Sequence, residues 1–96
     1  MVIGESAGAL ARRAEALGES RGVYAAAELQ RMLAHKSPLV REGAVCGAYY
    51  ARCARISGIV RLMATDDPSP GVRQTASDVV EEWDEATEAL REILAP

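Results

Sequence analysis

The stretch SPLVREGA at residues 37–44 recurs 32 positions later as SPGVRQTA at residues 69–76, and five of the eight positions (Ser, Pro, Val, Arg and Ala) are identical. Ser is a preferred N-cap residue, and Pro is favoured at the first helical position, where its missing N–H is no loss. Both stretches therefore predict the start of a helix. An internal repeat at this spacing is typical of helical hairpins that stack, because one hairpin cannot bury its apolar face alone.

Apolar residues at helical spacing predict five helices around these two starts. The predicted ranges are 5–17, 23–35, 38–53, 56–64 and 70–94. Gly18, Ser20 and Gly22 indicate a stop and a turn after the first helix. The last helix is by far the longest, at about 37 Å for a rise of 1.5 Å per residue. Part of it must therefore extend past its shorter neighbours or cover another surface.

The composition fits one all-α domain. Hydrophobic residues make up 49% of the 96 residues, Phe is absent and aromatic residues total 4%. Ala dominates the apolar content and favours closely packed helices, and the sequence has no strand-like run of β-branched and aromatic residues. It has neither an apolar run of about 18 residues nor a signal-peptide pattern, so we expect a cytoplasmic protein without membrane contact. Ten Arg against one Lys, with abundant Ala, indicate a GC-rich bacterial or phage genome.

A short turn with Asp or Pro, followed by Val-Arg and then by Ala three residues later, resembles the HEAT repeat. The segment LMATDDPSPGVRQTA at residues 62–76 is the most similar, and the resemblance covers about residues 23–80 as two short repeats. It implies a short α-solenoid of the armadillo/HEAT kind. HEAT-like arrays mostly act as scaffolds with many different partners, so it also implies protein binding. The expected organisation is one domain over residues 1–96, with a capping helix in 1–20, a first hairpin in 23–53 and a second hairpin in 56–94.

Arg41 and Arg73 occupy equivalent positions in the first turn of the two second helices. Asp66 or Asp67 is placed to pair with Arg73 and to favour the helix N-terminus. We interpret these arginines as turn-stabilising, with partner contact as the alternative.

The last helix has a predicted apolar seam and an acidic outer surface. Residues 65–96 contain two basic and nine acidic residues, for a net charge of −7, whereas residues 1–64 contain nine and five, for +4. The acidic surface predicts a solvated face, with docking of a basic partner as the alternative. The seam residues recur at alternating steps of four and three, the spacing of packed helices: Val72, Ala76, Val79, Trp83, Ala86, Leu90 and Ile93.

Tyr and Arg residues gather around the turn between the third and fourth predicted helices. The inner stripe of the third helix consists of Ala and Gly, so a neighbouring helix can approach closely and at least one Tyr must point away from it. Tyr and Arg are enriched at the centres of protein interfaces. An exposed Tyr is our first candidate for a partner anchor, with gap filling around the hairpin as the alternative. The candidate partner-binding residues are Tyr49, Tyr50, Arg52, Arg55 and Arg61.

The residues expected of a catalytic or metal site are missing from the sequence. His35 is the only His, and there is no glycine motif for phosphates. Cys46 and Cys53 lie on one predicted helix, about 10 Å apart, which is too far for a disulfide. We therefore expect no enzyme and no cofactor, but a non-catalytic protein-protein interaction module that acts as a scaffold or adaptor.

Two alternative functions stay open. A basic face formed by Arg41, Arg52, Arg55 and Arg61 would bind nucleic acid, as in some HEAT-like proteins, although a pI of about 5.1 argues against it. The seam of the last helix would instead pair with its own copy in a homodimer, which would make the chain a self-assembling structural subunit.

Overall fold

The computed structural model describes residues 4–96, and every regular element within that range is helical. The prediction of an all-α chain with a long last helix is confirmed. Residues 1–3 of the predicted capping segment lie outside the described residues. None of the helices in residues 4–96 is long and apolar enough to cross a membrane. The elements are α1 (Ala7–Arg21), a 3-10 turn η1 (Gly22–Ala25), α2 (Ala26–Leu33), α3 (Pro38–Ala48), α4 (Ala54–Asp66) and α5 (Pro70–Leu94).

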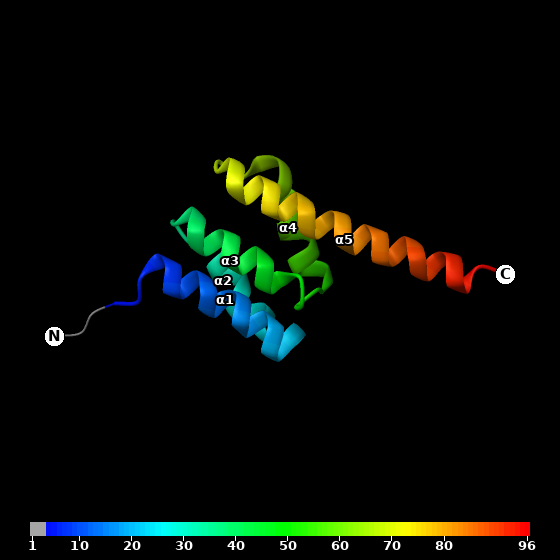
Figure 1. The fold of residues 1–96 in the computed structure, drawn as a ribbon, viewed down its shortest axis with the longest axis horizontal. Helices are drawn as coiled ribbons and strands as arrows, with labels where there is room; N and C mark the ends of the chain where they lie inside the picture. Colours follow the sequence, from blue (N-terminus) through cyan, green and yellow to red (C-terminus); the bar gives the residue numbers. More distant parts are fainter. Residues whose placement is uncertain (1–3) are drawn as a thin grey trace.

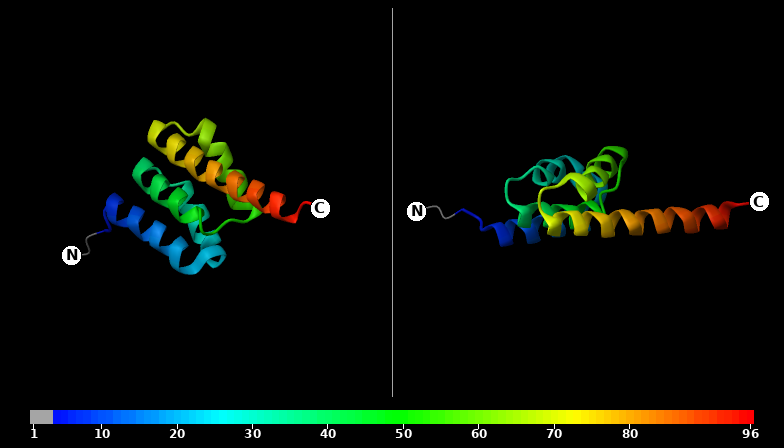
Figure 2. Two further views of the ribbon diagram at one scale, coloured as in Figure 1. Left: turned by 45° about the vertical axis from the view of Figure 1, so that its right-hand side comes forward. Right: turned by 90° about the horizontal axis from the view of Figure 1, so that it is seen from above.

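The helices form two layers (Figures 1 and 2). In one layer α1, α3 and α5 lie side by side and run in the same direction, with α3 in the middle. In the other layer α2 and α4 run back along α3 and α5. The core between the layers contains Leu29 of α2, Ile56 of α4 and Val72 of α5, all fully buried. Two helical hairpins, α2–α3 and α4–α5, therefore lie next to each other, and α1 covers the open side of α3.

Glycines allow α1 and α3 to come into backbone contact. A Cβ added to Gly43 of α3 would lie 2.6 Å from the Cα of Ala11, and one added to Gly18 of α1 would lie 2.6 Å from the Cα of Gly47. Real Cβ atoms do not approach that closely. The expectation that the small stripe of α3 admits a close neighbour is confirmed, and that neighbour is α1.

This packing also corrects the predicted end of the first helix. Gly18 was expected to stop it, but α1 continues to Arg21, and Gly18 is buried inside it against Gly47. The helix is followed by Gly22 as its C-cap, whose positive φ of 57° favours glycine. Gly18 allows two helices to approach closely. In a sequence, a glycine with this role cannot be told apart from one that ends a helix.

The predicted end of the third helix was wrong. It was expected to reach about Cys53, but α3 ends at Ala48 and Cys53 is the N-cap residue of α4. The indole Nε1–H of Trp83 donates to the Tyr49 carbonyl (3.2 Å), the acceptor that a continuing helix would use for the Cys53 amide. Cys46 and Cys53 therefore do not share a helix, and both are free thiols.

Other boundaries differ by a few residues. The second helix ends at Leu33 instead of His35, after a start in 3-10 geometry, and the fourth covers 54–66 instead of 56–64. Ser37 and Ser69 both occupy the expected N-cap position, but only the Ser69 side chain accepts an amide hydrogen bond, from Val72 (3.4 Å).

Only the first half of α5 is packed. The seam residues from Val72 to Trp83 are buried, whereas Leu90 and Ile93 are 54% and 78% exposed. In Figure 1 this C-terminal part projects beyond the other helices. The prediction that part of the last helix overhangs the hairpins is confirmed.

The surroundings of Gly43 and Gly58 predict opposite effects of a Gly-to-Ala substitution on stability. Gly43→Ala should lower the free energy of unfolding by about 1–3 kcal/mol, because its methyl group must push α1 away. Gly58→Ala on α4, where nothing lies within 4 Å of the added Cβ, should raise it by about 0.5–1 kcal/mol through helix propensity alone. Urea unfolding followed by circular dichroism measures both. A Gly43→Ala protein as stable as the wild type would contradict the α1–α3 contact.

Candidate functional site

The two tyrosines that were predicted to bind a partner lie just after the C-terminal end of α3, and both are accessible. Tyr49 is 38% and Tyr50 47% exposed. Their rings meet edge to face, with centroids 5.0 Å apart. Edge-to-face pairs of this kind contribute about 0.5–1.5 kcal/mol beyond the area that they bury. An exposed Tyr was the condition for the proposed partner anchor, and both residues meet it.

Arg52 is tied to α5. Its guanidinium lies over the Trp83 ring, 5.4 Å from the centroid, and donates to Thr87 Oγ1 (3.3 Å). Trp83 itself is only 3% exposed and bonds to the Tyr49 carbonyl. Arg52 and Tyr49 thus hold α5 against the turn that follows α3, while Arg52 itself stays exposed.

Arg61 lies apart from the tyrosines and is also paired. Its guanidinium forms an ion pair with Asp84 of α5 (2.8 Å). This hydrogen bond raises the pKa of Arg61 and lowers the pKa of Asp84. Arg55 is exposed in the first turn of α4. Of the five predicted residues, Tyr49 and Tyr50 contact each other, and the charges of Arg52 and Arg61 both act on Asp84 of α5.

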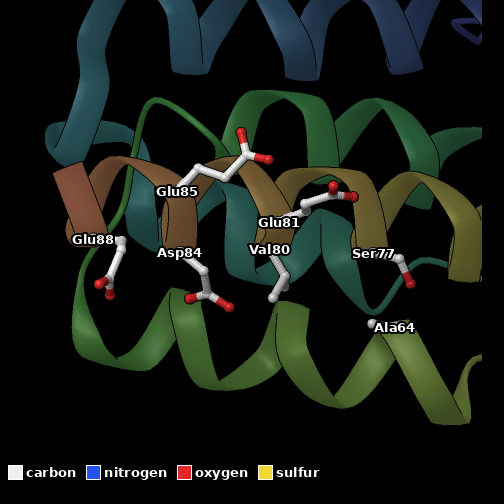
Figure 3. Close-up of a pocket in the computed structure, with 7 residues that line it drawn as sticks. All are labelled: Ala64, Ser77, Val80, Glu81, Asp84, Glu85 and Glu88. Atoms are coloured by element: carbon white, nitrogen blue, oxygen red, sulfur yellow. The ribbon is translucent and has the colours of Figure 1, made fainter.

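A groove of about 560 Å³ lies between α4 and α5 (Figure 3). Ala64 and Val80 are its apolar residues. The polar residues around them are mostly acidic: Ser77, Glu81, Asp84, Glu85 and Glu88. Because Asp84 already pairs with Arg61, part of the negative charge of this groove is neutralised from α4.

The layer of α1, α3 and α5 carries a second set of hollows, each smaller than this groove. Three hollows lie between these helices, and all three are lined by Cys46, which lies in the last turn of α3. Neighbouring hollows also share Glu15, Thr75, Val79 and Glu82, so they form one continuous surface, which we call the three-helix face. Its small or apolar lining residues are Ala11, Leu39, Gly43, Cys46 and Val79, its acidic ones are Glu15, Glu42, Asp78, Glu81, Glu82 and Glu85, and Tyr49 and Tyr50 lie at one end.

Two titratable groups that line this face, Cys46 and Tyr50, have raised pKa values. Burial, together with the charges of Glu15 and Glu42, raises the pKa of the Cys46 thiol. The charge of Glu19 is the largest cause that raises the pKa of Tyr50. Both groups therefore stay neutral at physiological pH.

The carboxylates of the three-helix face are not neutralised by ion pairs. In the described part of the chain the acidic partners in ion pairs are Glu5, Glu28, Asp67, Asp84 and Glu88. None of these lines the three hollows. Glu42 accepts only from the Thr75 hydroxyl (3.4 Å), and Asp78 only from the Gln74 amide (2.9 Å).

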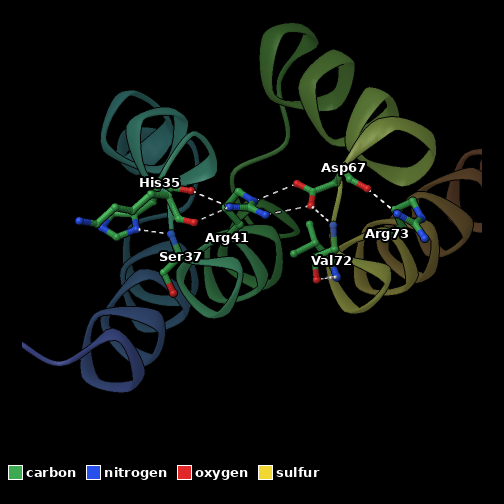
Figure 4. A network of polar contacts seen from close by, with 8 residues as sticks. His35, Ser37, Arg41, Asp67, Val72 and Arg73 are labelled. Carbon is green, nitrogen blue, oxygen red and sulfur yellow. Dashed lines mark hydrogen bonds and ion pairs between the residues drawn. The ribbon is translucent and has the colours of Figure 1, made fainter.

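Arg41 is an internal residue that links the two hairpins (Figure 4). Its guanidinium forms an ion pair with Asp67 (2.9 Å) and donates to the carbonyls of His35 (2.9 Å) and Lys36 (3.0 Å). Burial opposes ionisation of Asp67, but hydrogen bonds from Arg41 and from the Ser69 amide outweigh it and lower its pKa. Asp66 or Asp67 was expected to pair with Arg73, but among the described ion pairs neither does, and Arg73 donates to the Asp67 backbone carbonyl instead (2.6 Å).

The four arginines proposed for nucleic-acid binding therefore do not form one open basic surface. Arg41 is 13% exposed and paired, Arg52 lies on Trp83, and Arg61 is paired with Asp84. The recess that the helices present is acidic, which repels phosphates. This arrangement does not favour the nucleic-acid alternative.

Comparison of the chain with protein-family models, with curated proteins and with solved structures finds no match. A functional assignment must therefore come from the surface itself.

The residues of the three-helix face do not stand out as a group in the sequence. The acidic residues of α5 were visible as a group, but Glu15 and Glu42 come from two other helices and stand among residues of mixed charge. Their common feature is a position on the same side of three parallel helices. That side cannot be identified before the neighbours of α3 are known.

The Arg41–Asp67 pair predicts a pH-dependent stability difference. Asp67→Asn should lower the free energy of unfolding at pH 7 by about 3 kcal/mol, because it leaves the buried Arg41 without its counter-charge. The folded-state pKa of Asp67 is depressed, so this stabilisation is present above the unfolded pKa of about 3.9 and is lost as pH falls through the folded value. The difference between wild type and variant should narrow below about pH 4.

Urea unfolding at several pH values measures this difference. The exposed neighbour provides the control, since Asp66→Asn should change stability by less than about 0.5 kcal/mol at any pH. A difference between Asp67→Asn and wild type that stays constant with pH would show that the pair does not stabilise the fold.

Proposed function

We propose that this protein is a non-catalytic protein-binding module, built as a short HEAT-like array of the hairpins α2–α3 and α4–α5 with α1 as a cap. Support comes from hydrogen bonds that recur at the repeat spacing. The Ser37 amide donates to His35 Nδ1 (3.0 Å) and the Ser69 amide to Asp67 Oδ1 (2.9 Å). In the same way Arg41 donates to the His35 carbonyl and Arg73 to the Asp67 carbonyl, each six residues back.

The outer edge of the second hairpin has the polarity of a terminal unit. Leu29 and Val45 are fully buried between the hairpins, and the residues 32 positions later are Arg61 and Ser77, both exposed. Terminal repeats of helical arrays carry a polar outer face, because no further unit covers them. In this proposal, α1 covers one side of the two hairpins and the other side is a polar outer face.

The observation that carries the binding function is the three-helix face. It is recessed, it crosses all the helices of one layer, and Tyr49 and Tyr50 stand at its end with accessible rings. Rigid aromatic side chains beside a recess are typical anchors of protein interfaces. We assign the partner contact to Tyr49 and Tyr50, with Arg52 holding the turn beneath them.

Site-specific photocrosslinking tests this function. A photoreactive phenylalanine analogue at position 50 should give a light-dependent adduct with another protein in cells that express the chain. The matched control is position 24, because Tyr24 is 85% exposed but lies on η1. Adducts of equal yield from both positions, or none from either, would contradict a partner site at Tyr50.

We propose self-association through the end of α5 as a second candidate function. The observation that favours it is the exposed apolar pair Leu90 and Ile93 on the overhanging part of the helix. Burying such residues against a second copy would complete the seam.

Sedimentation at micromolar concentration tests the second candidate. A dimer should form, and Leu90→Gln with Ile93→Gln should return it to a monomer without changing the unfolding of the core. Leu62→Gln is the control, since Leu62 is an equally exposed apolar residue on α4. A wild-type chain that is monomeric throughout would remove this candidate.

A further inference from the structure

The three-helix face combines an uncompensated negative rim with an apolar floor. Glu15 comes from α1, Glu42 from α3 and Glu82 from α5, and all three line hollows that include Cys46. Like charges held on three separate helices repel one another, and a cation between them relieves that repulsion. The described ion pairs supply none there, because their basic members are Arg13, Arg21, Arg41, Arg61 and Arg91, which do not line the face.

One basic residue does line the face, but its head group points elsewhere. Arg12 is part of the hollow between α1 and α3. Its Nη1 atom lies 3.4 Å from the Cβ position of Gly8, one turn earlier on α1. The guanidinium is thus turned back along α1 toward Gly8, and among the described ion pairs it joins no carboxylate of the face.

The apolar residues that line the face can pack against the methylene groups of Lys and Arg side chains. Ala11, Cys46 and Val79 give the face small and apolar surfaces between the carboxylates. Lys and Arg cover apolar surface with their methylene groups while their charged ends reach polar partners. The tyrosine pair adds an aromatic site for a cation at one end.

We propose that the three-helix face binds an extended, Lys- and Arg-rich segment of a partner protein, with its cations held by Glu15, Glu42 and Glu82 and one of them against Tyr50. This inference rests on the proposed protein-binding function and adds the chemistry of the partner. The stated occupant is a basic polypeptide, chosen because its charge complements the face.

Fluorescence anisotropy with a labelled nonapeptide of alternating Lys, Arg and Ala tests the inference on the full chain. The peptide should bind at low salt and weaken in high salt, while an acidic peptide of the same length should not bind. Glu42→Gln with Glu82→Gln should lower the affinity for the basic peptide about tenfold, because each lost charge contact lowers the affinity about threefold. Tyr50→Ala should lower it about threefold.

Matched variants separate this site from bulk charge. Glu88→Gln with Glu92→Gln removes the same charge from the part of α5 beyond the three-helix face, and Tyr24→Ala removes an equally large exposed ring from η1. Both should leave the affinity unchanged. Circular dichroism and urea unfolding establish that each variant is folded before its affinity is compared.

Three results would overturn the inference: no binding of the basic peptide at low salt, equal binding of the acidic peptide, or equal weakening by the face and control variants. Failure here is distinguishable from failure of the proposed function. A protein adduct from position 50 without binding of the basic peptide would reject the basic partner and keep protein binding. Loss of both the adduct and the peptide would reject the two together.

Discussion

The carboxylate of Asp67 lies between the two hairpins and receives the Arg41 guanidinium of one and the Ser69 amide of the other. A buried ion pair adds little net stability over a well-packed apolar pair, but it is costly to break once formed. Its effect is therefore geometric. The pair fixes the turn before α5 against the start of α3. This alignment sets the distance between α3 and α5 in the layer that they form with α1.

The second determinant of that layer is the size of the side chains facing α1. Gly43 and Gly47 let α1 approach α3 to backbone contact, whereas the α3–α5 side is spaced by larger groups such as Thr75 and Glu42. The three helices thus stay parallel but are unequally spaced. Carboxylates from each of them consequently face the same recess without cations between them, although the chain has a net charge of only −3. The local charge of a surface, not the net charge of the chain, decides which partners it attracts.

Trp83 marks the point where α5 changes role. Up to this residue the helix belongs to the core, and the indole fixes the end of α3 through the Tyr49 carbonyl. This hydrogen bond joins α5 to the residues that follow α3, next to the tyrosine pair. Beyond Thr87 the same helix has no neighbour among the described residues, and its apolar seam meets solvent.

By itself the sequence determined the helical class, the two Ser-Pro helix starts and the length of α5, because these depend on local propensity, capping chemistry and periodicity. It also placed the buried part of the seam correctly, since alternating steps of four and three specify one side of a helix. Only the tertiary structure decided where α1 and α3 end: Gly18 packs against Gly47 within α1, and after Ala48 the amides of Tyr50 and Ala51 donate three residues back instead of four. It likewise decided that Asp67 pairs with Arg41 instead of Arg73 and that Glu15, Glu42 and Glu82 share one face. These outcomes depend on which residues far apart in the chain become neighbours, and no local pattern carries that information.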